Sequence, residues 1–140
     1  MSFDECDEML TGGMFLKLDE DGDSVKVILA AEPKPIPSDY HGAARTQHAF
    51  PIITSEGLKV WAVGPTLYKE LRDNWKGYSK NAILVTRKGK KNDKNTTYPI
   101  KVCPTPAKLS KQQNEITLDQ INALLDNVKE FAEKKYADLT

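Results

Sequence analysis

HAFPIITSEGLKVWAVGPTLYKEL, residues 48–71, is the stretch that decides the expected fold. Residues 48–54 and 58–64 are rich in β-branched and aromatic side chains, which favour strands. The triplet SEG at 55–57 separates them as a tight turn, so the two runs predict a β-hairpin. A proline then opens residues 65–78, where apolar side chains recur at helical spacing. The stretch therefore predicts a hairpin followed directly by a short amphipathic helix.

Further strands are expected on both sides of this unit. The runs MFLKL at 14–18 and SVKVILAA at 24–31 precede it, and NAILVTRK at 81–88 and TTYPIKVC at 96–103 follow it. Each alternates or concentrates apolar side chains in the manner of a strand. The segment 32–47 contains three prolines, a glycine and mixed polar residues, which predict a long loop.

The C-terminal segment predicts one long helix. Thr117 and Gln120 have the spacing of a capping box, which marks a helix start. The apolar positions that follow form a continuous stripe: Leu118, Ile121, Leu124, Leu125, Val128, Phe131, Ala132 and Leu139. Such a stripe must be buried, and both the chain's own barrel and a partner protein remain open as its cover.

The element order favours a mainly β fold with helices. A helix placed before the last two strands of a small β protein is typical of the OB-fold, a five-stranded Greek-key barrel with the helix between strands 3 and 4. An SH3-like barrel and a small α+β sheet are the alternatives. The expected organisation is an acidic lead-in at 1–12, the OB-fold domain at 13–104, a linker at 105–116 and the C-terminal helix at 117–139.

Composition limits the possible classes of protein. The 140 residues suit one domain, and 39% hydrophobic with 29% charged residues is ordinary for a soluble globular protein. No apolar run approaches the roughly 18 residues of a membrane span, and the acidic N-terminus is unlike a signal peptide, so a cytoplasmic location is expected. Cys6 and Cys103 are expected as free thiols. With His41 and His48 they lack paired ligand spacing, so neither a metal nor a cofactor is expected.

Catalysis finds no support in the sequence, and an enzyme is not expected. The chain contains no GxSxG, P-loop or HExxH motif. The acidic run DEDGD at 19–23 departs from a calcium-binding loop, because its glycine falls at the fourth position and Ala30 stands where the loop needs glutamate. This run is better interpreted as a solvated turn.

Charge is strongly asymmetric along the chain. Residues 1–23 carry eight acidic residues and one lysine, whereas residues 76–101 carry eight basic residues and one aspartate. The basic residues concentrate in TRKGKKNDKNTTY at 86–98, between two predicted strands. This pattern favours an anionic partner for the basic segment. Mutual neutralisation of the two segments, or a merely solubilising turn, is the alternative.

Aromatic and basic side chains share predicted strand faces. Phe15 accompanies Lys17, and Trp61 accompanies Lys59, on the less aliphatic faces of their strands. Single-stranded nucleic acid needs such pairs, because bases stack on flat rings and phosphates contact Lys or Arg. The candidate nucleic-acid-binding residues are Phe15, Lys17, Lys26, Tyr40, Lys59, Trp61, Arg87, Lys88, Lys90, Lys91 and Lys94. Core packing remains the alternative for Phe15 and Trp61.

Three segments resemble a family of phage and prophage single-stranded-DNA-binding proteins: HAFPIITSEGLKVWAVGPTLYKEL, TRKGKKNDKNTTYPIKVCP and FLKLDEDGDSVKVILAAEP. Together they cover most of residues 14–104. The family is similar in design to the T-even phage single-stranded-DNA-binding core, an OB-fold with a basic aromatic cleft. The resemblance implies action in DNA replication, recombination and repair in the host cytoplasm, with replication or recombination proteins as further partners.

The chain departs from the family in two places. Many relatives carry a zinc-type Cys/His insertion after the second strand, whereas the segment 32–47 has His41 and no cysteine, so no metal is expected. Asp93 and Thr97 also lie further apart than the adjacent Asp-Thr of the family.

Two functions therefore remain open. The first is largely sequence-independent binding of single-stranded DNA, with RNA as an open alternative. The second is a protein-interaction module that uses the amphipathic C-terminal helix and binds no nucleic acid.

Overall fold

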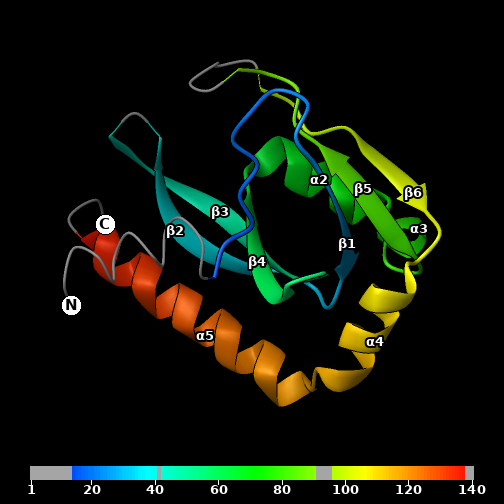
Figure 1. Cartoon of the computed structure of the whole chain (residues 1–140). Helices are drawn as coiled ribbons and strands as arrows, with labels where there is room; N and C mark the ends of the chain where they lie inside the picture. Colours follow the sequence, from blue (N-terminus) through cyan, green and yellow to red (C-terminus); the bar gives the residue numbers. More distant parts are fainter. Residues whose placement is uncertain (1–13, 41, 91–95, 138–140) are drawn as a thin grey trace.

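The computed structural model describes residues 14–40, 42–90 and 96–137. Within these ranges the chain forms a six-stranded antiparallel sheet and four helices (Figure 1). The strands are β1 (Ser24–Leu29), β2 (Lys34–Tyr40), β3 (Ala43–Thr54), β4 (Gly57–Val63), β5 (Ala82–Thr86) and β6 (Ile100–Cys103). The helices are α2 (Pro65–Asp73), α3 (Trp75–Tyr78), α4 (Ala107–Glu115) and α5 (Leu118–Lys135).

Strand β3 organises the sheet. Along one edge it pairs with the whole of β4, and along the other it pairs first with β2 and then with the end of β1. Strand β1 is shared, because Ile28 and Leu29 pair with β3 while the residues before them pair with β5. Strand β6 pairs with β5. Among the described residues the path ends at β6 without returning to β4, so the sheet is open and the expected five-stranded OB-fold is not confirmed.

The hairpin of β3 and β4 confirms the central prediction. Phe50 pairs with Trp61 and Thr54 pairs with Gly57 across the tight turn. Gly57 has φ of 113°, a left-handed conformation that glycine adopts without strain. The helix predicted after the hairpin is present as two pieces, α2 and α3, which are separated at Asn74.

Two sequence-based expectations of strands and loops are wrong, and a third segment contains an unexpected helix. The predicted loop at 32–47 forms β2 and the first part of β3, because β2 is an edge strand and its alternate prolines leave the ladder to β3 intact. The predicted strand at 14–18 forms only an isolated bridge, Phe15 to Val60. The predicted linker at 105–116 contains the helix α4, whose Leu109 is buried.

Both faces of the β3–β4 hairpin are covered. On one face Phe50, Trp61 and Leu71 of α2 belong to one buried cluster. On the other face the apolar stripe of α5 packs on the sheet through Ile121, Leu125, Val128 and Ala132. This part of the stripe is thus covered by the chain's own sheet, whereas Leu118 is exposed and Leu139 lies outside the described residues. Lys34 of β2 adds an ion pair to Asp126 of α5 at 2.7 Å.

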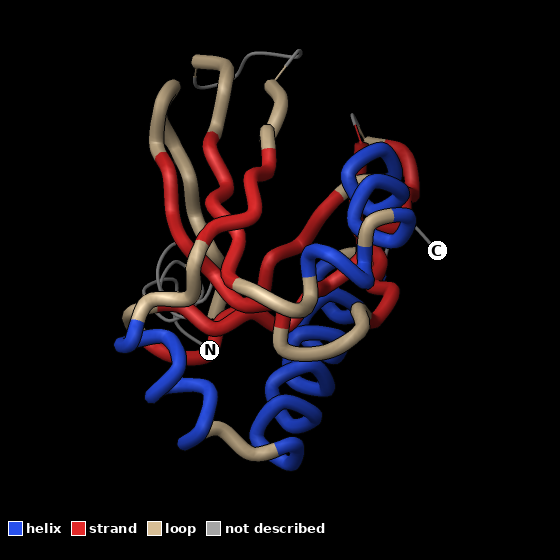
Figure 2. Tube along the Cα trace, turned by 90° about the vertical axis from the view of Figure 1, so that its right-hand side faces the viewer, coloured by secondary structure: helices blue, strands red, loops and turns tan. Residues whose placement is uncertain are grey.

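The start of α5 matches the predicted capping box. The backbone N–H of Gln120 donates to Oγ1 of Thr117 at 3.2 Å, and the backbone N–H of Thr117 donates to Oε1 of Gln120 at 2.7 Å. The corner between α4 and α5 lies at the end of the molecule opposite to the turn at 19–23 (Figures 1 and 2). In the part of the chain that the structure describes, no helix has the length and apolar character needed to cross a membrane.

Candidate nucleic-acid interface

A groove of about 440 Å³ lies where the segment 16–18 meets the start of α2. It is bordered by the segment 16–18, the β2–β3 hairpin, the start of α2 and the residues that lead into β6. The side chains with polar or aromatic groups in its lining are Lys17, Arg45, Gln47, Trp61, Thr66, Thr96 and Tyr98. We call it the hairpin groove. Two cations and two aromatic rings therefore line one hollow.

Gly64, which has no side chain, leaves room for the Arg45 side chain at the start of α2. A Cβ atom added to Gly64 would overlap the Arg45 guanidinium, so glycine is the residue that lets this side chain cross the helix start. Sequence analysis missed Arg45 because it lies in the segment that was predicted as a loop. If this segment had been assigned to a strand, Arg45 would have been predicted to share a face with Gln47, two residues later on β3.

Trp61 is the largest correction among the candidate residues. An exposed stacking position was predicted, but only 5% of its surface is exposed, because it lies in the core cluster with side chains of β1, β3, β5 and α2. Trp61 still borders the floor of the hairpin groove. Tyr98 is half-buried against the core cluster and lines the same groove. The aromatic surface available to a ligand in the groove is therefore mainly that of Tyr98.

Phe15 is also placed differently from the expectation. It packs against Phe131 of α5 with ring centroids 6.4 Å apart, and it belongs to the cluster beneath that helix. Its neighbour Lys17 is exposed, lines the hairpin groove and lies 3.8 Å from Asp19. The predicted pair of Phe15 and Lys17 is thus divided between the core and the groove.

Two predicted lysines lie outside the hairpin groove. Lys26 is exposed on β1 opposite Leu84, whereas Val25 and Val27 belong to the core on the other face. Lys59 is largely buried and forms an ion pair with Glu56 at 2.8 Å. That contact lowers the pKa of the Glu56 carboxyl below its ordinary value, first through the hydrogen bond and then through the charge of Lys59.

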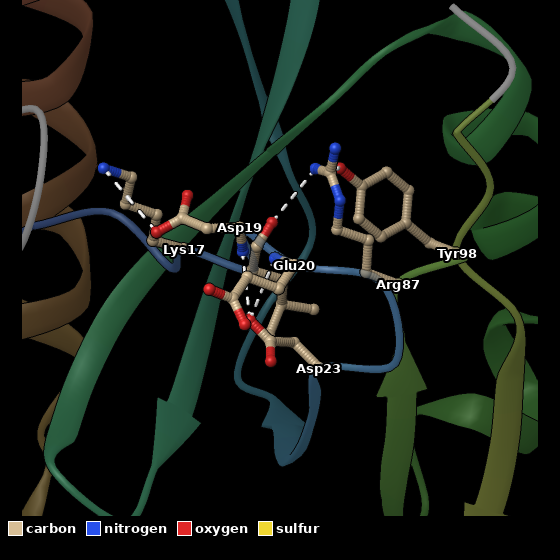
Figure 3. Close-up of polar contacts among 7 residues, drawn as sticks. Lys17, Asp19, Glu20, Asp23, Arg87 and Tyr98 are labelled. Carbon is tan, nitrogen blue, oxygen red and sulfur yellow. Dashed lines mark hydrogen bonds and ion pairs between the residues drawn. The ribbon is translucent and has the colours of Figure 1, made fainter. Parts of the chain in front are cut away.

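Arg87 binds protein groups rather than facing an open surface. Its guanidinium donates to the carbonyl oxygens of Leu18 at 3.0 Å, Gly89 at 2.9 Å and Lys90 at 3.1 Å. It also donates to the Tyr98 hydroxyl at 3.2 Å. Figure 3 shows Arg87 beside Tyr98, with its bond to the backbone of the acidic segment. Arg87 thus fastens the base of the β5–β6 hairpin, and its predicted phosphate contact stays a prediction.

The acidic turn at 19–23 is joined to the basic hairpin. The Asp23 carboxylate accepts from the backbone N–H groups of Asp19 at 3.3 Å and Glu20 at 3.1 Å, which closes the turn (Figure 3). Asp21 accepts from the backbone N–H of Gly89 at 3.0 Å. These contacts support the alternative that oppositely charged segments are neighbours in the fold.

The remaining candidates are Tyr40, Lys88, Lys90, Lys91 and Lys94. Lys88 and Lys90 are exposed, and the backbone of Lys88 pairs with Thr97. Lys91, Lys94 and the side chain of Tyr40 lie outside the described residues. The acidic lead-in at 1–12 and His41 also lie outside them.

The described residues contain no group of three or more His, Cys, Asp or Glu side chains that could hold a metal ion. Cys103 is a free thiol. In comparisons with known proteins, no protein family, curated protein or solved structure matches this chain.

Proposed function

We propose that the protein binds single-stranded DNA in the hairpin groove, largely without sequence preference. The observation that carries the proposal is the presence of Lys17, Arg45 and Tyr98 in the lining of one groove. Cationic side chains contact phosphates, and a tyrosine ring offers a face to any base. These are sequence-independent interactions, so the proposal includes no base preference.

The size of the groove favours a single strand. A volume of about 440 Å³ lies in the usual range for pockets that hold small ligands, and it suits one or two nucleotides rather than a duplex. The exposed Lys88 and Lys90 at the neighbouring hairpin are placed to contact phosphates beyond the groove.

The strand connections also support the proposal. A hairpin of β3 and β4, a helical segment, and a hairpin of β5 and β6 follow one another as in an OB-fold, and β1 pairs with both hairpins. We infer an open variant of the OB-fold, extended by β2. OB-folds bind oligonucleotides on this kind of scaffold. Together with the sequence resemblance, this favours a role in replication, recombination and repair of phage-type DNA.

The alternative, protein interaction through the C-terminal helix, has less support. The buried side of α5 packs on the chain's own sheet, and Leu118 is a large apolar residue of α5 that is 65% exposed. An isolated leucine on a helix surface is normal in monomeric proteins. We therefore favour the hairpin groove as the binding surface.

Fluorescence anisotropy with labelled oligo-dT tests the proposal. Arg45→Ala and Lys17→Ala are each expected to weaken binding and to reduce the salt slope by about 0.7 per lost phosphate contact. Lys26→Ala is the matched control, since it removes an exposed lysine outside the groove. An Arg45→Ala, Lys17→Ala double variant that binds oligo-dT as well as the Lys26→Ala control would show that the groove is not the DNA site.

A further inference from the structure

A second hollow of about 460 Å³ lies beside α2, and the residues that line it differ from those of the hairpin groove. Its walls are Glu32 and Pro33 after β1, Pro35 of β2, Tyr68 and Arg72 of α2, and Trp75 of α3. His48 and Phe50 of β3 complete the lining. We call it the aromatic pocket.

The ring contacts hold the walls of the aromatic pocket in place. His48 stacks on Tyr68 with centroids 3.7 Å apart and planes 8° apart. The Arg72 guanidinium lies over the Tyr68 ring at 5.7 Å. Phe50 meets Trp75 at 6.0 Å and is itself fully buried. Because Phe50 is buried behind it, the half-buried Trp75 is the ring best placed to offer an aromatic surface to a ligand.

His48 contributes a neutral, polar part of the lining. Burial lowers the pKa of its imidazole below the ordinary value of 6.5, so the ring is uncharged at pH 7. Its Nδ1 is buried and has no hydrogen-bond partner within the described residues. Buried polar atoms without a partner are rare in folded proteins, so this atom of the pocket lining calls for an explanation.

The charged groups of the pocket have opposite signs. Glu32 supplies a carboxylate that accepts hydrogen bonds, and Arg72 supplies a guanidinium that donates them. Arg72 also contacts the neighbouring Asp73 through Nε at 3.3 Å. A ligand with a flat ring, N–H groups on the ring edge and a phosphate can contact all three groups. The ring stacks on the indole of Trp75, the N–H groups donate to the carboxylate of Glu32, and the phosphate accepts from the guanidinium of Arg72.

We propose that the aromatic pocket binds a single nucleotide, with the base against Trp75, the base edge toward Glu32 and the phosphate toward Arg72. The volume is within the range of small-ligand sites. This proposal does not depend on DNA binding in the hairpin groove, because the two hollows share no lining residue.

Titration of the ¹⁵N-labelled protein with GMP and CMP, followed by NMR, tests the proposal. We expect saturable shifts of the Trp75 indole signal and of the backbone signals of Glu32 and Arg72. Ribose 5-phosphate, which lacks a base, is the matched ligand control and is expected to leave the Trp75 indole unshifted. Shifts confined to Lys17 and Arg45, or none that saturate, would contradict the proposal.

Variants of the exposed pocket residues give a second measurement. Arg72→Ala and Glu32→Gln alter surface side chains, so the fold is expected to persist, and each is expected to weaken nucleotide binding. Trp75→Leu is expected to cost roughly tenfold in affinity, the equivalent of one lost base stack. Lys111→Ala, which removes an exposed lysine of α4 outside both hollows, is the control that leaves nucleotide binding unchanged. If Arg72→Ala and Glu32→Gln both bind as the wild type does, or if a proline-rich peptide binds the pocket and nucleotides do not, the assignment is wrong.

Discussion

Two regions of the molecule, the turn end of the β3–β4 hairpin and the surroundings of the hairpin groove, are stabilised by different interactions. Near the 55–57 turn, residues 49–54 of β3 are all buried, because α4, α5 and the core beside α2 cover both faces. Beside the hairpin groove, polar contacts join the segment 18–23 to the β5–β6 hairpin. The Arg87 side chain donates to the Leu18 carbonyl, the Gly89 N–H donates to Asp21, and the Arg87 N–H donates to the Asp23 carbonyl. Apolar burial thus stabilises the first end, while the second keeps polar groups near solvent. Changes at the first are expected to affect stability, and changes at the second to affect binding and local order.

The largest effect is expected in the helix-covered end. Ile52 is fully buried, so Ile52→Ala is expected to lower the free energy of unfolding by about 2–5 kcal/mol through lost transfer energy and a cavity. Urea unfolding followed by circular dichroism measures it. Leu118→Ala is the matched control, because that leucine is 65% exposed and its loss is expected to cost little. Equal losses in the two variants would contradict the comparison.

Arg87→Ala breaks the polar contacts at the other end. We expect a loss of about 1–3 kcal/mol, because the carbonyl oxygens of Leu18 and Gly89 lose their charged donor. Faster hydrogen exchange at Gly22 and Lys88 is expected to accompany it, since both backbone groups pair at this junction. Lys88→Ala, which removes an exposed neighbour, is the control. If exchange at Gly22 is unchanged in Arg87→Ala, the arginine does not fasten the hairpin.

Gly64→Ala separates binding from stability in the hairpin groove. The added methyl group displaces the Arg45 guanidinium, so we expect roughly a tenfold loss of oligo-dT affinity, in the range of one lost charged contact. Gly77→Ala is the matched control, because a Cβ there meets no atom within 4 Å. An affinity loss of the same size in Gly77→Ala would show that the position of Arg45 is not responsible.

The smallest effect concerns pH. Burial depresses the pKa of His48 below 6.5 in the folded state, so the unfolded state binds the proton more readily. Stability from this group is fully present above pH 6.5 and is lost as the pH falls from there toward the folded-state pKa. The pKa values of the Glu56 and Asp126 carboxyls are lowered by Lys59 and Lys34, so the stability that these groups contribute is lost only at lower pH, as the carboxylates become protonated. Urea midpoints at pH 7.5 and 5.5 measure the effect, and His48→Phe is expected to reduce their difference; an unchanged difference would contradict this assignment.

Much of the local structure was predictable because its causes are local. The alternation around 48–64, the proline that opens α2 and the pairing of Thr117 with Gln120 depend on neighbours in the chain. The strand β2 was missed because prolines normally interrupt strands, and only its position at the edge of the sheet makes them acceptable.

The candidate site was less predictable. Strand alternation assigned Trp61 to one face of β4, but it carries no information on whether a helix covers that face. The charge of Arg87 was evident, yet its five hydrogen-bond donors are directed at groups distant in sequence, such as the Leu18 carbonyl. The position of Arg45 in the groove depends on the close approach of its side chain to Gly64, which is distant in sequence and which no local pattern indicates.

The sequence by itself determined the β3–β4 hairpin, the amphipathic α5 and the basic segment at 86–98, because side-chain periodicity, turn chemistry and charge are properties of neighbouring residues. Only the tertiary structure decided that α5 covers the chain's own sheet, that Trp61 is buried, and that Lys17, Arg45 and Tyr98 share one groove. The physical reason is that burial and electrostatic partners depend on which distant segments meet, and this is settled by the packing of the whole chain.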